Sequence, residues 1–264
     1  MPEKFGKPNH ISIDKFEQEA KEKIAEGMYT SWEIAPVCDL SCPHCYSLYE
    51  EQEHDFRESS QLPQLSRPFY ENLSLEQIER GLDNLKKVGT KFINIEGGEP
   101  TLRPDIISVL RAVKSRRMET IMSTHGMYLL KSENPNEPLL AEKLRGILDI
   151  LSISLDADNR EVNDSVRRKK SGRPSNHFDM IVEFLKWYGQ EFRRKEENGK
   201  PLYNLKINTV VMQNNLDSIS GIGEIVKKLI PAEAGVQLKL VQFQPRGRGR
   251  ENKEVLQVTD EDLR

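Results

Sequence analysis

The chain has 264 residues, with 39 basic and 42 acidic side chains and a net charge of −3. This length suits one large domain or two modest ones, and the near balance of charge argues against a broad basic surface for nucleic acid. The longest apolar run, residues 127–130, is far shorter than the roughly 20 apolar residues of a membrane span. The N-terminus also lacks the apolar stretch of a secretory signal. We therefore expect a cytoplasmic protein that makes no membrane contact.

The first predicted elements are a helix, a strand and a long polar segment. Residues 14–27 repeat apolar side chains every four positions, begin with a plausible capping box and end at a glycine, which predicts a helix. Residues 29–35 alternate in the way of a strand. Residues 46–72 are polar, contain prolines and show no period, so we expect a long loop or insertion there. Loops of this length are often lids over a site.

From Ser74 onward, amphipathic helices and short apolar strands alternate. Helices are predicted at 74–89, 104–113, 138–147, 178–188 and 219–230, and strands at 91–95, 120–123, 148–155, 205–212 and 238–243. This alternation is typical of an α/β protein with a parallel sheet covered by helices. With the strand at 29–35, six strands are too few for an eightfold barrel. We predict a partial (βα)6 barrel with ligands at the carboxyl ends of its strands.

The chain divides into three predicted parts. Residues 1–28 are expected to form an N-terminal helical extension, and residues 29–244 the core domain, with 46–72 inserted in it. Residues 245–264 form a C-terminal tail, in which arginines separated by glycines predict a loop.

Three cysteines carry the strongest chemical signal. Cys38, Cys42 and Cys45 are the only cysteines and lie within eight residues, directly after the first predicted strand. They exclude a disulfide framework and indicate metal binding or catalysis in a reducing compartment. Zinc prefers four ligands and would need a fourth, such as His44 or His54. A cubane iron-sulfur cluster normally takes four cysteines, so three would leave one iron open to another ligand.

Two further motifs support the iron-sulfur interpretation. Gly-Gly-Glu-Pro at 97–100 ends the second predicted strand, and Ser-Ile-Ser-Leu-Asp at 152–156 ends the fourth. Together with the CxxxCxxC spacing, they resemble the radical S-adenosylmethionine (radical SAM) superfamily over about residues 29–243. The resemblance implies a [4Fe-4S] cluster held by the three cysteines, whose open iron is chelated by S-adenosylmethionine (SAM). It also implies reductive cleavage of SAM to methionine and a 5′-deoxyadenosyl radical that abstracts hydrogen from a substrate.

The resemblance also assigns residues to SAM. A glycine pair lets the backbone approach a ligand closely, a guanidinium such as that of Arg167 can pair with the SAM carboxylate, and Asn208 can offer an amide to the ribose hydroxyls. His125 stands where relatives often have asparagine, and we interpret it as a turn residue. The SAM-binding residues implied in this way are His44, Gly97, Gly98, Glu99, Pro100, Thr124, Ser154, Asp156, Arg167, Asn208 and Val210.

The substrate is less defined by the sequence. Residues 244–262 resemble the junction before a C-terminal SPASM or twitch region of peptide-maturing relatives, which carries auxiliary clusters. No further cysteine is present, so we expect a core without auxiliary clusters or one truncated before them. Residues 149–154 and 206–208 resemble the viperin-type branch, which modifies nucleotides, as an alternative.

The resemblance further implies two kinds of partner, a peptide or small-molecule substrate and a low-potential electron donor such as a flavodoxin or ferredoxin. Alternatives of another class are a zinc-stabilised binding module and a non-catalytic iron-sulfur protein. Neither alternative needs a SAM pocket, so the motifs at 97–100 and 152–156 favour the enzyme.

Overall fold

A computed structural model describes residues 27–46, 73–132, 134–171, 173, 175–194, 202–259 and 262. The helix predicted at 14–27 and the candidate lid predicted at 46–72 lie outside these residues, apart from residues 27 and 46.

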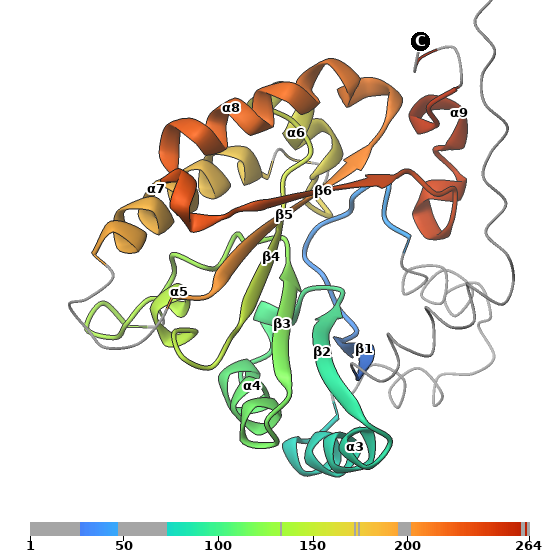
Figure 1. Cartoon of the computed structure of the whole chain (residues 1–264). Coiled ribbons are helices and arrows are strands. Elements are labelled where there is room, and N and C mark those ends of the chain that lie inside the picture. Colours follow the sequence, from blue (N-terminus) through green and yellow to red (C-terminus); the bar gives the residue numbers. More distant parts are fainter. Residues whose placement is uncertain are drawn as a thin grey trace, which may run out of the picture.

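The described strands form one six-stranded sheet in which every neighbouring pair is parallel. The strands are β1 (Met28–Ala35), β2 (Thr90–Gly97), β3 (Glu119–Thr124), β4 (Ile150–Ser154), β5 (Asn204–Val211) and β6 (Gln237–Gln242). Their order in space is their order in the sequence, so each connection advances the sheet in the same direction and the sheet curls (Figure 1). β1 and β6 are its two edges, and the predicted partial barrel is confirmed.

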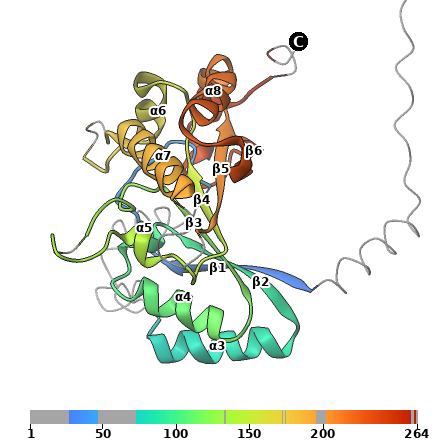
Figure 2. The ribbon, with the colours of Figure 1, turned by 60° about the vertical axis from the view of Figure 1, so that its left-hand side comes forward.

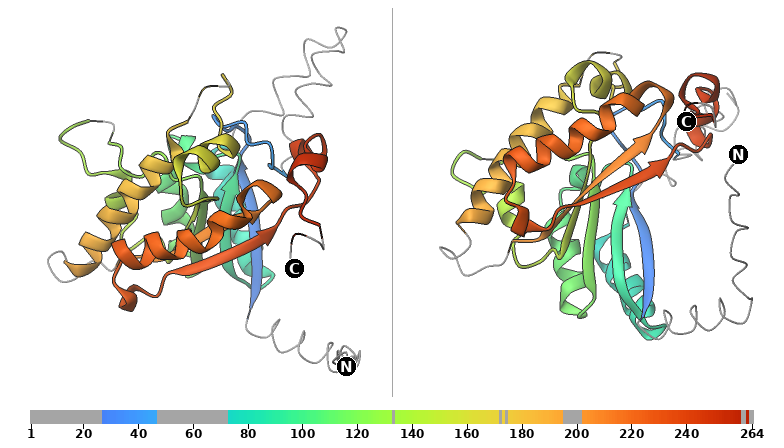
Figure 3. Two further views of the ribbon diagram at one scale, coloured as in Figure 1. Left: turned by 90° about the horizontal axis from the view of Figure 1, so that it is seen from above. Right: turned by 45° about the horizontal axis from the view of Figure 1, so that its top comes forward.

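Helices cover the outer side of this sheet. They are α3 (Leu75–Lys87), α4 (Ile106–Ser115), α5 (Leu140–Lys143), α6 (Arg160–Val166), α7 (His177–Arg193) and α8 (Ile219–Leu229). The short helix α9 (Lys253–Leu256) lies instead beyond the carboxyl end of β6, next to the 3-10 helix Gln213–Ser218. Figure 2 shows α3 and α4 together at the end formed by β1 and β2, while α6, α7 and α8 gather around β5 and β6. In Figure 3, α7 and α8 run side by side along the sheet. Among the described helices, none has the length and apolar character needed to cross a membrane.

Successive strand residues alternate between the helices and the inner side of the barrel. On β5, Leu205 and Ile207 are buried in the main hydrophobic core, whereas Lys206, Asn208 and Val210 line a cavity on the inner side. Burying a leucine or isoleucine stabilises the fold by about 1.5–3 kcal/mol. The core therefore lies between sheet and helices, and the inner side remains available for polar side chains.

Local signals explain the start and end of α3. The Ser74 hydroxyl accepts a hydrogen bond from the Gln77 amide at 3.2 Å, and the Gln77 side chain accepts one from the Ser74 amide at 2.8 Å. Gly89, with φ +91°, follows the helix in the left-handed region that favours glycine. The predicted capping box and glycine stop are both confirmed.

Three sequence-based predictions differ from the structure. The helix predicted at 138–147 is α-helical only over Leu140–Lys143. The helix α6 was not predicted, because its polar sequence carries no apolar stripe; it begins where the Asn159 side chain accepts from the Val162 amide at 2.9 Å. The predicted loop after Pro245 instead contains a 3-10 helix (Gly247–Arg250) and α9, since buried Leu256 anchors this segment in a small apolar cluster.

Candidate active site

The three cysteines lie in the loop of residues 36–46 that follows β1 at the carboxyl end of the sheet. Leu40 forms an isolated antiparallel bridge with Lys169. The amide of Ser41 donates to the carbonyl of Arg168 at 2.6 Å. The cysteine loop is therefore tied to the segment that follows α6, far away in the sequence.

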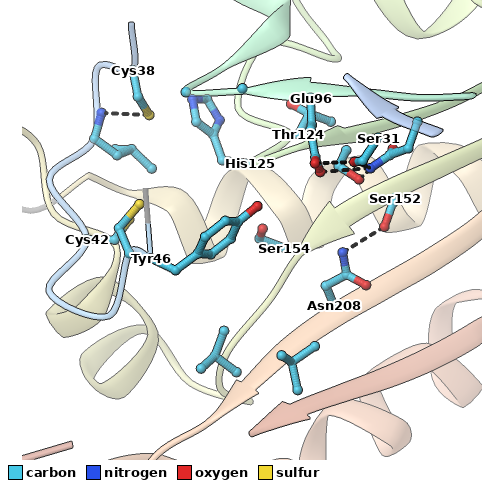
Figure 4. Close-up of a pocket in the computed structure, with 18 of the residues that line it drawn as sticks. Ser31, Cys38, Cys42, Tyr46, Glu96, Thr124, His125, Ser152, Ser154 and Asn208 are labelled. Carbon is cyan, nitrogen blue, oxygen red and sulfur yellow. Dashed lines mark hydrogen bonds between the residues drawn. The ribbon is translucent and has the colours of Figure 1, made fainter. Parts of the chain in front are cut away.

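All three cysteines line one cavity of about 520 Å³, and Figure 4 shows Cys38 and Cys42 at one side of it. Cys42 is buried, and Cys38 and Cys45 are half-buried. Burial raises the pKa of the Cys42 thiol to about 11, although the guanidinium of Arg167 opposes the rise. Burial also raises the pKa of Cys38 well above its usual range. Metal binding at this loop must therefore displace protons from the thiols.

The glycine pair after β2 lies directly against the cysteine loop. The Gly98 amide donates to the Ala35 carbonyl at 2.6 Å, and the Glu99 amide donates to the Val37 carbonyl at 2.8 Å. A Cβ atom on Gly98 would lie 2.3 Å from the Val37 oxygen, and Gly97 has a φ of +148°, which favours glycine. Both glycines line the cavity. The close approach of these glycines to Ala35 and Val37 holds the ends of β1 and β2 together.

Glu99 joins the ends of β2 and β3 from a fully buried position. Its carboxylate accepts from the Thr124 hydroxyl at 2.5 Å, from the His125 amide at 2.8 Å and from the Thr101 amide at 3.0 Å. Neither Glu99 nor Pro100 lines the cavity. The Glu99 carboxylate is therefore occupied by protein donors that hold the carboxyl ends of the strands in place.

A buried ion pair places a positive charge beside the cysteine loop. Arg167 Nε donates to Asp156 Oδ2 at 2.7 Å, and the Val210 amide donates to Asp156 Oδ1 at 2.9 Å. Burial alone would raise the pKa of Asp156, but the charge of Arg167 brings it below its usual value. Arg167 Nη1 lies 3.8 Å from Cys42 Sγ and faces the cavity. Asp156 therefore orients a guanidinium that can balance negative charge at the cysteines.

Two polar atoms at the cavity are buried without a hydrogen-bond partner in the described structure, His44 Nδ1 and Asn208 Oδ1. The other ring nitrogen, His44 Nε2, lies 3.6 Å from Asp156 Oδ2. Burial lowers the pKa of His44 to about 4, so the ring is neutral at pH 7. The Asn208 amide nitrogen donates to Ser152 Oγ at 2.8 Å. Unsatisfied buried polar atoms are costly, so a ligand that reaches them would be stabilised.

The structure brings most of the sequence-predicted residues to one cavity. Those that line it are Cys38, Cys42, His44, Cys45, Gly97, Gly98, Thr124, Ser154, Arg167, Asn208 and Val210. Glu99, Pro100 and Asp156 lie behind its wall and act on it through the residues that they hold.

The sequence interpretation missed a polar network on the inner side of the first strands. Asn94 donates to Glu96 at 2.8 Å, Ser31 also donates to Glu96, and Ser123 donates to Asn94 at 2.9 Å. All four residues line the cavity, and Figure 4 shows Ser31 and Glu96 together at the side away from the cysteines. Ser152 continues this polar wall on β4. The polar residue at every second strand position is the signal that could have revealed them.

Comparison with known protein families gives a match to the radical SAM superfamily over residues 32–218. The chain belongs to this superfamily. The mycofactocin maturase MftC of Mycolicibacterium smegmatis is 29% identical over 236 residues, which are 89% of this chain and 49% of that relative. The AdoMet-dependent heme synthase of Methanosarcina barkeri is 27% identical over 226 residues, 85% of this chain and 53% of that relative. This radical SAM chain therefore spans about half the length of these curated relatives.

The fold of this radical SAM protein is similar to that of Streptococcus suis SuiB, solved bound to its precursor peptide SuiA. The TM-score is 0.57 at 18% identity, and the match covers 91% of this chain and 48% of SuiB.

The superfamily uses a [4Fe-4S] cluster and SAM, and the site fits both groups. Three thiols reach one cavity, a guanidinium lies beside them, and unpartnered polar atoms remain for a ligand. Membership in this superfamily favours a SAM-binding iron-sulfur site over a zinc-stabilised module.

Proposed function

We propose that this chain is the catalytic core of a radical SAM enzyme that acts on a peptide during peptide or natural-product maturation. One observation carries the catalytic part: the three cysteines face the same cavity as the unpartnered His44 Nδ1 and Asn208 Oδ1. MftC is a maturase, and the similarity to it over 89% of the chain supports a role in maturation.

In this proposal, Cys38, Cys42 and Cys45 hold the cluster and leave one iron without a protein ligand. With the cluster and SAM bound, the site would supply reductive cleavage of SAM and, through it, removal of a hydrogen atom from the substrate. Arg167, held by Asp156, places its remaining N–H groups toward the cavity, where they can pair with the SAM carboxylate.

The strand residues would position the rest of SAM and the substrate. Ser154 and Asn208 would contact the ribose, and Val210 the adenine. A reactive carbon radical needs one substrate hydrogen held close and competing groups kept away. The wall of the curled sheet, with the core behind it, would exclude water from that space. A low-potential flavodoxin or ferredoxin would deliver the electron.

Anaerobic reconstitution tests the catalytic part. We expect the protein to bind about four irons and, with dithionite as reductant, to release 5′-deoxyadenosine from SAM, measured by mass spectrometry. Cys42→Ala should lose both properties. Ser41→Ala, in the same loop but outside the cavity lining, should retain both. A wild-type protein that binds iron and yields no 5′-deoxyadenosine contradicts the proposal.

Peptides encoded beside this gene test the substrate part. They are incubated with the reconstituted enzyme and SAM, and both the peptide mass and the yield of 5′-deoxyadenosine are followed. We expect one peptide to change mass and to raise the yield above the substrate-free level. Nucleoside triphosphates form a parallel arm; a mass change in a nucleotide alone would replace the peptide by the nucleotide-modifying alternative.

A further inference from the structure

Two lysines face the cavity from neighbouring strands, Lys206 on β5 and Lys239 on β6. In the parallel register Lys206 is opposite Gln237, and Asn208 is opposite Lys239. The lysines are therefore diagonal neighbours on the same inner face, within reach of a single bound group. Since Lys206 lies near the start of β5 and the cysteines follow the end of β1, Lys206 lies in the half of the cavity away from the cysteines.

The cavity has more positive than negative side chains. Among the described residues that line it, Glu96 is the one carboxylate, and it is engaged with Ser31 and Asn94. The cations are Arg167, Lys170, Lys206, Lys239 and Arg248. Arg167 and Arg248 belong to the cysteine side, since Arg167 lies beside Cys42 Sγ and Arg248 donates to the Cys42 carbonyl at 2.8 Å.

Lys206 and Lys239 lack a balancing charge. Within the described part of the chain, no carboxylate lies at ion-pair distance from either ammonium group. Burial lowers the pKa of Lys206, and the charge of Lys239 lowers it further. Two like charges on one wall repel each other, and a bound anion would relieve that repulsion.

Neutral polar groups next to the lysines complete the arrangement. Ser152 pairs with Lys206 in the register of β4 and β5, and its oxygen already accepts from Asn208 at 2.8 Å. Its hydroxyl can therefore still donate a hydrogen bond to an acceptor on a ligand. Gln237 adds an amide opposite Lys206 on the other side. An oxyanion between these groups would receive charge-assisted and neutral hydrogen bonds together.

We propose that Lys206 and Lys239, with Ser152, bind an anionic group of the substrate, a carboxylate or a phosphate, in the half of the cavity away from the cysteines. The inference rests on the proposed function, because the anion belongs to the molecule that is modified. It defines the substrate class as one in which a negative charge lies at a distance from the reacting carbon. A peptide with a free C-terminal carboxylate has this form, and so does a phosphorylated small molecule.

The test uses reconstituted holoenzyme with SAM bound, so that Arg167 is already engaged. Binding of tripolyphosphate, of the tripeptide Gly-Gly-Gly and of its C-terminal amide is measured by calorimetry at low ionic strength. The variants are Lys206→Gln with Lys239→Gln, the conservative pair Lys206→Arg with Lys239→Arg, and the charge-matched control Lys227→Gln with Lys228→Gln on the exposed face of α8.

We expect the glutamine pair to weaken binding of at least one anionic probe by tenfold or more, while the arginine pair and the α8 control stay within threefold of wild type. A preference for tripolyphosphate indicates a phosphate, and a preference for the free tripeptide over its amide indicates a carboxylate. Equal affinities of wild type and the glutamine pair for both anions overturn the inference, as does a glutamine-pair loss that the arginine pair does not restore.

The same wild-type preparation is assayed for iron and for 5′-deoxyadenosine. If the wild type makes no 5′-deoxyadenosine but binds an anionic probe more tightly than the glutamine pair does, the proposed function alone is wrong. A wild type that makes 5′-deoxyadenosine while the lysines do not affect anion binding overturns this inference alone.

Discussion

His125 Nε2 lies 2.9 Å from Asp39 Oδ1, and Asp39 directly follows Cys38. The Tyr128 hydroxyl donates to the other carboxylate oxygen of Asp39 at 2.6 Å. Burial alone would raise the pKa of Asp39, but hydrogen bonds from His125 and Tyr128 lower it to about 2. The residue interpreted from the sequence as a turn histidine therefore holds the cysteine loop from the end of β3.

We predict that His125→Ala weakens retention of the cluster. Losing the partly buried hydrogen bond to Asp39 costs about 1 kcal/mol, so iron should be released to a chelator several-fold faster than from wild type. Absorbance of the chelator complex measures the rate. Glu224→Ala on α8 serves as the control and should release iron at the wild-type rate. Identical rates for His125→Ala and the control would show that His125 does not support the loop.

Asp156→Ala should destabilise the fold. The change leaves the guanidinium of Arg167 buried without its counter-charge, which typically costs about 3–5 kcal/mol. Urea unfolding of the iron-free protein, followed by circular dichroism, measures the loss. Glu224→Ala removes an exposed pair with Lys227 and should leave the unfolding midpoint unchanged. A loss no larger than that of Glu224→Ala would contradict the structural role of Asp156.

Gly98→Ala should prevent assembly of the cysteine loop. The added carbon would lie 2.3 Å from the Val37 oxygen and 2.9 Å from the Cys38 nitrogen, so the loop must shift. We expect the variant to bind well below the roughly four irons of a complete cluster. Gly223→Ala is the matched control, because an added Cβ there meets nothing within 4 Å, and it should stabilise α8 by about 0.5–1 kcal/mol. Full iron loading of Gly98→Ala would refute the close-approach argument.

His177 should make stability fall in mild acid. Burial, with the charge of Arg167, lowers its pKa to about 3, and its Nδ1 lies 2.9 Å from the Asn163 amide nitrogen. The folded state therefore keeps the ring neutral, while the unfolded chain binds a proton near pH 6.5. Stability from this residue is complete above pH 6.5 and is lost as the pH falls toward 3.

Urea unfolding at pH 7 and pH 5 measures this effect. His177 should account for about 2 kcal/mol of the loss between these pH values. His177→Gln, which cannot titrate, should show a loss smaller by that amount. Equal losses in wild type and variant would mean that His177 does not remain neutral in the folded protein.

Much of the fold could be predicted from the sequence, because helices and strands leave local apolar periodicities, capping residues and glycine stops in it. The stripe of α3, its cap at Ser74 and the stop at Gly89 are visible in the sequence and present in the structure. The helix α6 was missed because tertiary contacts, not an apolar stripe, stabilise it: buried Asn163 and Asp164 hydrogen-bond to neighbouring segments.

The sequence motifs named candidate site residues but did not say which of them face the cavity. Glu99 and Asp156 follow strand ends, where the alternation of faces stops, and both turn into the protein to bind donors from other segments. Lys206 and Lys239 could be placed together only after strand register was known, since no motif had assigned a role to either lysine.

On β4 and β5, residues that pack the core alternate with residues that line the cavity, so folding and ligand choice depend on different positions. Outward residues such as Leu151 and Ile207 are fully buried under the helices, and changing their size would open or crowd the core. Inward residues such as Ser152 and Lys206 contribute no packing to that core, so their replacement alters what the cavity accepts while the scaffold persists. Descendants of one ancestral barrel could thus acquire new substrates by changing every second residue, and a directed-evolution library confined to those inward positions would sample specificity at little risk to folding.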